Sequence, residues 1–195
     1  MNTPSNPHFG LVPSPFIARF AHLVPSGARV LDLACGYGRH AVYFATRGAR
    51  VVAVDRDAAA LATLSRTAGI ETRQVDLETG TWPLAGERFD AIVVSHYLHR
   101  PVFPHLRAAL AADGALLYET FALGNEAFGR PTNPAFLLQP GELLTVATVG
   151  PHPMTVVAFE QGIVEIAQRP AVLQRLAAVG AGRPWPPMLD TVRAP

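Results

Sequence analysis

The amino-acid sequence predicts an α/β domain built on a doubly wound, mostly parallel sheet. Short apolar runs rich in β-branched residues alternate with stretches of helical composition through residues 29–120. Residues 30–77 contain no proline, so regular structure should be densest there. The chain has 195 residues, of which 49% are hydrophobic and 16% charged, and this balance suits one buried core and argues against disorder.

Local patterns define each element of the first two thirds of the chain. Residues 15–24 carry Phe16, Phe20 and Leu23 on one face of a short amphipathic helix. Asp57 is an N-cap for a helix that should reach about residue 68, and Gly48 ends the helix before it. The other predicted elements are strands at residues 29–34, 50–55, 70–75, 89–95 and 115–120 and helices at residues 39–47 and 102–111. This alternation implies a parallel sheet covered on both faces and wound by right-handed crossovers.

The pattern changes after Phe121. The expected elements are a long polar loop at residues 124–134, a helix at residues 141–149 and two extended segments at residues 155–160 and 171–179, with residues 163–168 between them. The second extended segment contains Leu, Ala, Gln and Arg, which also favour a helix, so periodicity leaves its type open.

Charge and cysteine content narrow the function classes. Sixteen basic and fifteen acidic residues leave a net charge of +1 without a basic run, so nucleic acid is not an electrostatically favoured partner. Cys35 is the only cysteine, which excludes an internal disulfide framework. Residues 1–10 lack the order of a signal peptide, and no apolar run has the length of a membrane span. We therefore expect a cytoplasmic protein without a membrane partner.

A glycine turn between the first strand and the next helix indicates a nucleotide site. Gly36 and Gly38 satisfy a dinucleotide fingerprint there, and glycines let the backbone approach a ligand closely. Asp55 lies 19 residues past Gly36 at the end of the second strand, where a carboxylate can accept hydrogen bonds from ribose hydroxyls. Both NAD and S-adenosylmethionine (SAM) carry a ribose, so these residues alone do not choose between them.

Asp32 favours SAM. We expect it, four residues before Gly36, to face the crevice at the carboxyl end of the first strand, where it would repel a pyrophosphate. SAM has no phosphate and carries a sulfonium and an ammonium, which a carboxylate attracts. The alternative is that Asp32 only caps the turn that follows it.

Asp76 extends this pattern, because Asp32, Asp55 and Asp76 end, or nearly end, three successive strands. Ligands of open parallel sheets bind outside the carboxyl ends of the strands. Asp76 would accept a hydrogen bond from the adenine amino group, with Leu77 against the ring. Its alternative is a plain loop aspartate.

Four short motifs occur in order. Residues 30–38 resemble motif I of class I SAM-dependent methyltransferases, and residues 54–55, 75–77 and 89–95 look like the second, third and fourth motifs. The resemblance covers residues 30–120 well. The pattern within residues 118–138 is similar to a bacterial branch described as tellurite-resistance-type or methyltransferase-domain proteins. One departure is the absence of a third glycine, since Tyr37 and Arg39 flank Gly38.

This resemblance implies a seven-stranded sheet with an antiparallel last strand, and it favours strands at residues 155–160 and 171–179. It also implies SAM as cofactor and S-adenosylhomocysteine (SAH) as product. The residues that we assign to cofactor binding are Asp32, Gly36, Gly38, Asp55, Arg56, Asp76, Leu77 and Ser95. We expect one domain over residues 1–195, comprising an N-terminal helical segment (1–28), a SAM-binding half (30–121) and a substrate loop with C-terminal strands (122–195).

The loop after the fourth strand, residues 95–101, is the expected methyl-transfer site. His96 or His99 would act as a general base, and Tyr97 would shape the pocket. Surface and packing roles are the alternatives for these side chains. Arg130, in the long loop, would hold a carboxylate or oxyanion substrate, unless it pairs with Glu126 instead.

A metal site is not expected, because the spacing of His96, His99, His105 and Cys35 matches no zinc pattern. The sequence therefore predicts a SAM-dependent methyltransferase that acts on a small-molecule acceptor, with a homodimer possible. The alternative is a non-catalytic SAM-binding sensor or partner protein, because the fold persists when chemistry is lost. An NAD-dependent oxidoreductase is disfavoured by Asp32 and by the missing substrate half.

Overall fold

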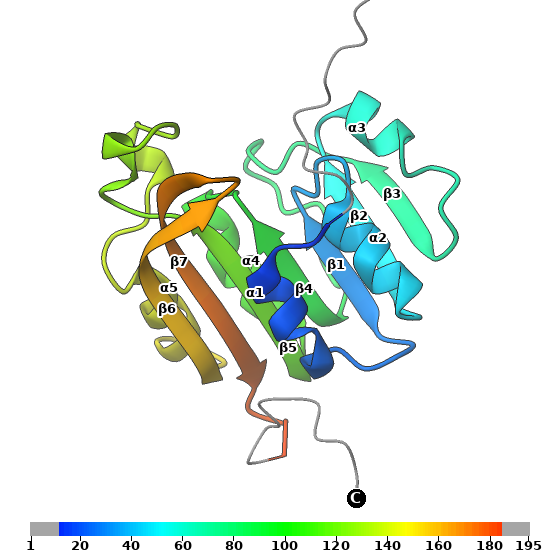
Figure 1. Ribbon diagram of the computed structural model, residues 1–195. Coiled ribbons are helices and arrows are strands. Elements are labelled where there is room, and N and C mark those ends of the chain that lie inside the picture. Colours follow the sequence, from blue (N-terminus) through cyan, green and yellow to red (C-terminus); the bar gives the residue numbers. More distant parts are fainter. Residues whose placement is uncertain (1–11, 185–195) are drawn as a thin grey trace, which may run out of the picture.

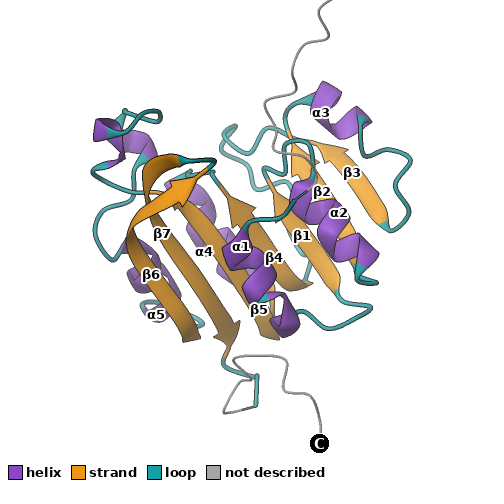
Figure 2. Ribbon diagram, viewed as in Figure 1, coloured by secondary structure: helices purple, strands orange, loops and turns teal. Residues whose placement is uncertain are grey.

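The computed structural model describes residues 12–184 and consists of a seven-stranded sheet with helices on both faces (Figures 1 and 2). The strand order is β3-β2-β1-β4-β5-β7-β6. The strands are β1 (Arg29–Leu33), β2 (Arg50–Asp55), β3 (Ile70–Gln74), β4 (Phe89–Ser95), β5 (Leu110–Phe121), β6 (Met154–Ile166) and β7 (Arg169–Gly180). Residues 1–11 and 185–195 lie outside the described residues. The first of these ranges includes residues 1–10, where the sequence predicts no signal peptide.

The strands β1 to β5 pair in parallel, and β7 runs antiparallel to both β5 and β6. The predicted fold class, with its antiparallel last strand, is confirmed. The segment 171–179, which composition left open, is a strand. The winding reverses at β1, which has β2 on one side and β4 on the other. A crevice at the carboxyl ends of these three strands is where open parallel sheets bind ligands.

Helices cover the sheet in two layers, α1 and α2 on one face and α4 and α5 on the other (Figure 2). Their bounds are α1 (Pro15–Arg19), α2 (Arg39–Thr46), α3 (Ala58–Ala62), α4 (Phe103–Ala109) and α5 (Glu142–Thr148), with short 3-10 turns η1 (Ala21–Leu23), η2 (Arg100–Val102), η3 (Asn125–Ala127) and η4 (Pro134–Phe136). Within residues 12–184, none of these helices combines the length and hydrophobicity that crossing a membrane requires.

Alternation along β1 divides its side chains between these two layers. Leu31 and Leu33 are fully buried in the cluster that α4 and α5 complete. Val30 belongs to the opposite cluster, with α1 and α2. Asp32 has the same parity as Val30, so its side chain points toward α2.

The helix that begins after Asp57 is shorter than predicted. The cap itself is present, because Asp57 Oδ1 accepts hydrogen bonds from the amides of Ala59 and Ala60. The α-helix ends at Ala62, and turns replace the expected continuation to residue 68. The hydroxyls of Thr63 and Ser65 donate to backbone carbonyls three residues earlier, a local bond that competes with helix geometry.

The C-terminal strands are longer than predicted and form one hairpin. Residues 163–168, expected between two short segments, supply the end of β6 and the turn, and Ile166 pairs with Arg169. Ala167 and Gln168 connect the strands with φ values of 51° and 63°. Two successive positive φ angles are typical of the two-residue turns that match strand twist.

Candidate functional site

The turn between β1 and α2 brings the backbone of Gly38 close to the side chain of Leu64 and leaves the backbone of Gly36 open. Gly38 has a φ of 74°, and a Cβ there would lie 2.3 Å from Leu64 Cδ1. Gly36 has a φ of 54°, yet a Cβ on it would meet no atom within 4 Å. Gly38 is therefore required by packing, whereas the space in front of Gly36 is available to a ligand.

A third residue of this turn has a left-handed backbone, and it is Ala34, with a φ of 54°. Its backbone conformation is one that glycine adopts more readily than alanine. Ala34 also lines the cavity described next.

Asp55 fastens the glycine turn to the end of β2. The amide of Gly36 donates to Asp55 Oδ2 at 2.7 Å, and the amide of Asp57 donates to Oδ1 at 2.9 Å. These amides orient the carboxylate without using all of its acceptor capacity. Asp55 is half-buried and faces the cavity.

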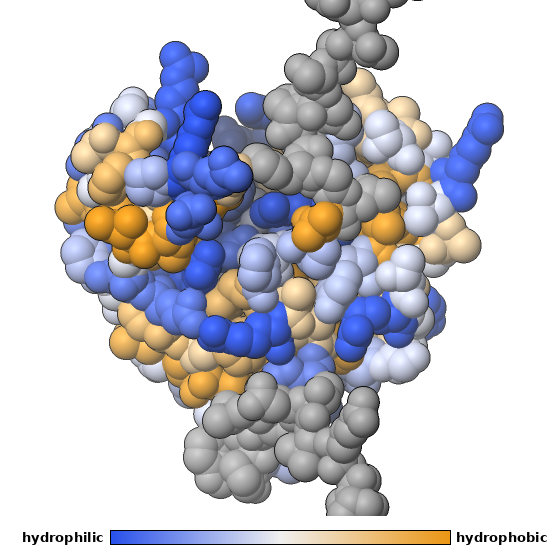
Figure 3. Space-filling model, in the orientation of Figure 1, coloured by the Kyte–Doolittle hydropathy of each residue, from blue (hydrophilic) through white to orange (hydrophobic). Residues whose placement is uncertain are grey.

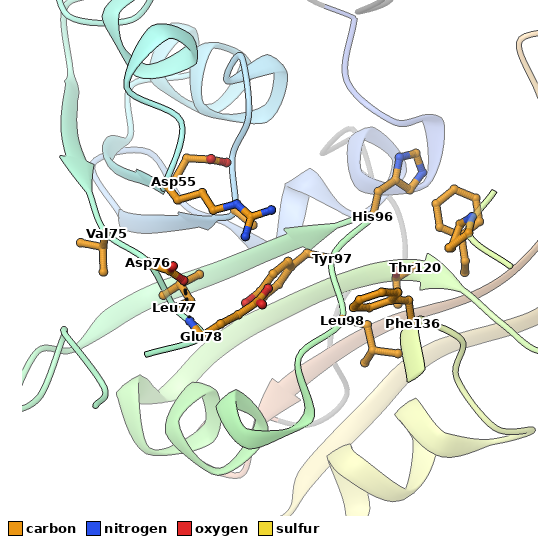
Figure 4. A pocket seen from close by; sticks show the side chains of 14 residues that line it. Asp55, Val75, Asp76, Leu77, Glu78, His96, Tyr97, Leu98, Thr120 and Phe136 are labelled. Carbon is orange, nitrogen blue, oxygen red and sulfur yellow. Dashed lines mark hydrogen bonds between the residues drawn. The ribbon is translucent and has the colours of Figure 1, made fainter. Parts of the chain in front are cut away.

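A cavity of about 390 Å³ lies at the carboxyl ends of the central strands (Figure 4). Its lining residues are Ala34, Asp55, Arg56, Val75, Asp76, Leu77, Glu78, His96, Tyr97, Leu98, Thr120, Phe121, Pro131 and Phe136. Figure 4 shows Asp55 and Asp76 at one end, Leu98 and Phe136 at the other, and Tyr97 between them. The cavity therefore has an acidic end and an apolar end.

The hydroxyl of Tyr97 is a buried polar group without a hydrogen-bond partner in the described structure. Burial raises the pKa of Tyr97 to about 12, and the nearby Glu78 and Asp76 carboxylates add to this effect. The hydroxyl is therefore protonated at neutral pH and can donate. A buried donor on a cavity wall without a partner fits a site that a ligand completes.

Asp32 does not face the cavity, and this expectation was wrong. Its side chain is buried beneath the start of α2, where its Oδ2 accepts a hydrogen bond from the amide of Ala41 at 2.8 Å. Burial raises its pKa to about 7, although the Ala41 amide and the Arg39 charge oppose the rise. The cause is the pleat of β1, which sends residues 30 and 32 to the face of the sheet that α1 and α2 cover. Repulsion of a pyrophosphate by Asp32 therefore carries less weight than the sequence suggested.

His96 stands immediately after β4 with a φ of 55°, and its side chain is exposed to the cavity. Its amide donates to the carbonyl of Glu119 at 2.9 Å, and its ring lies 4.9 Å from the Phe121 ring. Removal of the ring from water lowers the pKa of His96 below its ordinary value. Glu119 opposes this shift, and Arg39 and Arg175 reinforce it. His96 is thus neutral at pH 7 and able to accept a proton.

Behind His96 lies a buried carboxylate that sequence reasoning did not single out. Glu119, on β5, accepts hydrogen bonds from Ser14 Oγ at 2.7 Å and Ser95 Oγ at 3.0 Å. Arg39 and Arg175 approach it at 3.7 Å and 3.5 Å. An acid inside the apolar run of β5 was the available sequence signal, the same signal that drew attention to Asp32.

This cluster holds the N-terminal segment beside the site. The amide of Ser14 donates to His40 Nε2 at 3.1 Å, and burial lowers the pKa of His40 to about 3, so the ring is a neutral acceptor. A second opening of about 350 Å³ is lined by this segment, by Arg39, Glu119 and Arg175, and by the tip of the β6–β7 hairpin. His96 lines both openings.

The structure brings half of the predicted site residues to the cavity. Asp55, Arg56, Asp76, Leu77, His96 and Tyr97 line the cavity. Ser95 lies behind it and accepts from Arg39 at 2.9 Å. His99 and Arg130 are not among the lining residues, and Arg130 is exposed. Among residues 12–184, His, Cys, Asp and Glu form no group of three or more suited to a metal ion.

Comparison with known proteins bears on this site. The family described as a methyltransferase domain matches residues 30–115, which include β1 to β4 and the glycine turn. No curated protein matches the chain.

Solved structures share the fold at low sequence identity. TehB from Haemophilus influenzae is 19% identical with a TM-score of 0.69, over 84% of this chain and 61% of that one. A TehB-like SAM-dependent methyltransferase from Corynebacterium glutamicum is 18% identical, with a TM-score of 0.60 over 84% and 85% of the two chains. The N-methyltransferase NodS from Bradyrhizobium japonicum is 18% identical, with a TM-score of 0.61 over 84% and 92%. This chain thus spans less than two thirds of the TehB structure.

Proposed function

We propose that this chain is a class I SAM-dependent methyltransferase and that it transfers the methyl group to a small-molecule acceptor beside His96. The observation that carries the proposal is the cavity that joins the Asp55 and Asp76 carboxylates to the imidazole of His96. Candidate cofactor-binding groups and a candidate proton acceptor thus line one continuous cavity.

The residues around the glycine turn fit SAM. The space in front of Gly36 admits a ligand against bare backbone. Asp55 and Asp76 offer carboxylate oxygens for ribose hydroxyls and an adenine amino group, and the unpartnered Tyr97 hydroxyl offers a donor. Asp55, Asp76 and Glu78 on this wall, in place of Asp32, would repel the pyrophosphate of a dinucleotide.

Arg39 is a further candidate for cofactor binding. It follows Gly38 directly, and its guanidinium is held by Ser95 and Glu119 on the side of the turn away from Asp76. A cofactor whose adenosine lies against Asp55 and Asp76 would extend its methionine carboxylate toward this cation. Arg39 Nη2 contacts Ser95 at 2.9 Å and Glu119 at 3.7 Å, and the guanidinium has further N–H donors for a carboxylate.

When bound, SAM supplies a methyl group on a cationic sulfur, which the lone pair of the acceptor displaces as the carbon–sulfur bond breaks. The protein contributes mainly position and dehydration, because the reaction is a displacement at a single carbon. His96 takes the proton that an acidic nucleophile releases. Its lowered pKa keeps it in the accepting form at neutral pH.

Tyr97 and Leu98 shape the wall next to His96. The hydroxyl of Tyr118 donates to the carbonyl of Tyr97 at 2.8 Å and thereby fixes the loop that carries both histidines. His99 and Arg130 lie outside the cavity lining, so neither has a part in this proposal. A small-molecule acceptor is supported by the enclosed cavity and by the absence of a basic run in the sequence.

The test is transfer of labelled methyl from SAM to a panel of thiols, phenols, amines and carboxylates. We expect transfer to at least one member, and its product should be identified by mass spectrometry. SAH binding without transfer to any class would instead favour the sensor role. The absence of SAM and SAH binding would remove the proposal altogether.

A further inference from the structure

The apolar end of the cavity is built from side chains of two loops and β5. Beyond His96, its walls are Leu98, Thr120, Phe121, Pro131 and Phe136. Figure 4 shows Leu98 and Phe136 at this end, on the far side of Tyr97 from Asp55 and Asp76. Thr120 is the only hydrogen-bonding side chain in that group, so the walls present carbon surface almost throughout.

Arg100 and Arg130, the cations nearest in sequence to these walls, do not line the cavity. Arg100 makes a two-point contact with Glu142, its Nε to Oε1 at 2.7 Å and its Nη2 to Oε2 at 2.9 Å. Arg130 is exposed and does not line the cavity, although it precedes Pro131 directly. Except for His96, no side chain at the apolar end can carry a positive charge.

Arg100 instead fixes the position of Phe136. Its guanidinium donates to the carbonyl of Ala135 and to that of Leu137, both at 2.9 Å. These carbonyls flank Phe136 in sequence, and Leu137 is fully buried. The backbone on both sides of Phe136 is thus held in place before any ligand arrives, which reduces the entropic cost of binding.

Apolar side chains continue from the cavity to the surface. Leu123, Phe128 and Phe136 are 44%, 42% and 49% exposed, and all three belong to the segment that follows β5. Figure 3 shows hydrophobic residues gathered over the side of the molecule that carries this segment and the hairpin tip. Of these three, Phe136 also lines the cavity, so an apolar side chain extends from the cavity wall to the surface.

We propose that the methyl acceptor is an uncharged molecule with a flat apolar ring, which binds against Phe121, Pro131 and Phe136 with its nucleophilic atom toward His96. This proposal rests on the proposed methyltransferase function. Aromatic side chains favour stacked or edge-on contact with such a ring. An anionic acceptor would lose its hydration here without gaining a paired cation.

The test measures binding of methylated products to the complex of the full chain with SAH, by calorimetry. Thioanisole has the ring and no charge, whereas methylthioacetate has a carboxylate and no ring, and both carry the same methylated sulfur. We expect thioanisole to bind at least about 10-fold more tightly, given the free energy of burying a ring of this size. Phe136→Ala should weaken thioanisole by roughly 10-fold, the loss of about two buried methylene equivalents.

Phe128→Ala is the matched control, because Phe128 lies on the same loop with similar exposure but does not line the cavity. Unchanged thioanisole affinity in this control, together with the loss in Phe136→Ala, supports the proposal. It is overturned if methylthioacetate binds as tightly as thioanisole, if thioanisole does not bind, or if the two variants behave alike. Failure of SAH itself to bind would mark failure of the proposed function rather than of this inference.

Discussion

The amide of Gly36 donates a 2.7 Å hydrogen bond to Asp55 Oδ2, although α2 and most of β2 separate the two residues along the chain. Through this bond the glycine turn and the acid at the end of β2 form one unit. Asp55 lines the cavity together with Asp76 and His96. Asp55 therefore supports the glycine turn, and in the proposed function it also binds the cofactor.

Replacing Asp55 with Ala should weaken SAH binding by about 1–3 kcal/mol, the cost of losing a charged acceptor in a partly buried site. Isothermal calorimetry measures this directly. Asp57→Ala is the control, since Asp57 caps α3 and does not line the cavity. It should lower stability by roughly 1 kcal/mol and leave SAH affinity unchanged. Equal losses of affinity in both variants would mean that Asp55 acts only through local structure.

Stability should depend on pH through Asp32. Burial raises its folded pKa to about 7, above its value in the unfolded chain, so the folded state holds a proton that the unfolded state releases. Between about pH 4 and pH 7 the wild type should therefore lose stability relative to Asp32→Asn as pH rises, by roughly 1.4 kcal/mol for each unit of pKa difference. Urea denaturation of both proteins at several pH values measures this loss. A constant difference across that range would show that Asp32 is ionised in the fold.

Glu119→Gln should destabilise the fold by roughly 1–3 kcal/mol, because Arg39 and Arg175 would lose the buried carboxylate between them. Glu160→Gln removes a more exposed partner of Arg175 and should cost less than about 1 kcal/mol. Chemical denaturation compares the two variants. If Glu119→Gln lowered the free energy of unfolding no more than Glu160→Gln, the buried carboxylate of Glu119 would not stabilise the fold through Arg39 and Arg175.

His96→Ala should lower turnover about 10²–10⁴-fold with the best acceptor while SAH affinity stays nearly constant. His99→Ala, three residues later and outside the cavity lining, should retain activity. In the wild type, activity should fall with acidification only below the ordinary histidine pKa of about 6.5, since the pKa of His96 is lowered. Full activity in His96→Ala would show that the acceptor loses its proton to solvent or by its own ionisation, without His96.

The sequence was sufficient for the parallel half of the fold because β1, β2, β4 and β5 each contain a compact apolar run. The mostly polar β3 followed from its place in the strand–helix alternation. It was insufficient for the β6–β7 hairpin, where Ala167 and Gln168 form the turn. Turns with two positive φ angles ordinarily carry Asn or Gly, and their absence removed the local signal. The hairpin is fixed instead by the long pairing of its strands.

The site divides in the same way. Asp55, Asp76 and His96 follow strands directly, so topology alone predicts that they gather at one edge. The face of the sheet to which Asp32 points depends on the register of β1, because a shift of one residue moves each side chain to the opposite face. The sequence alone does not determine this register. The cluster of Ser14, Arg39 and Arg175 around Glu119 joins distant segments and follows only from the three-dimensional packing.

A crystal structure of the SAH complex tests the central claim most directly. The account predicts density for SAH in the cavity of Figure 4, with the ribose at Asp55, the adenine at Asp76 and the sulfur toward His96. Another opening, of about 530 Å³, lies at the opposite end of the sheet and is lined in part by Arg88, Arg107 and His152. Density there, with the cavity beside His96 empty, would contradict the account.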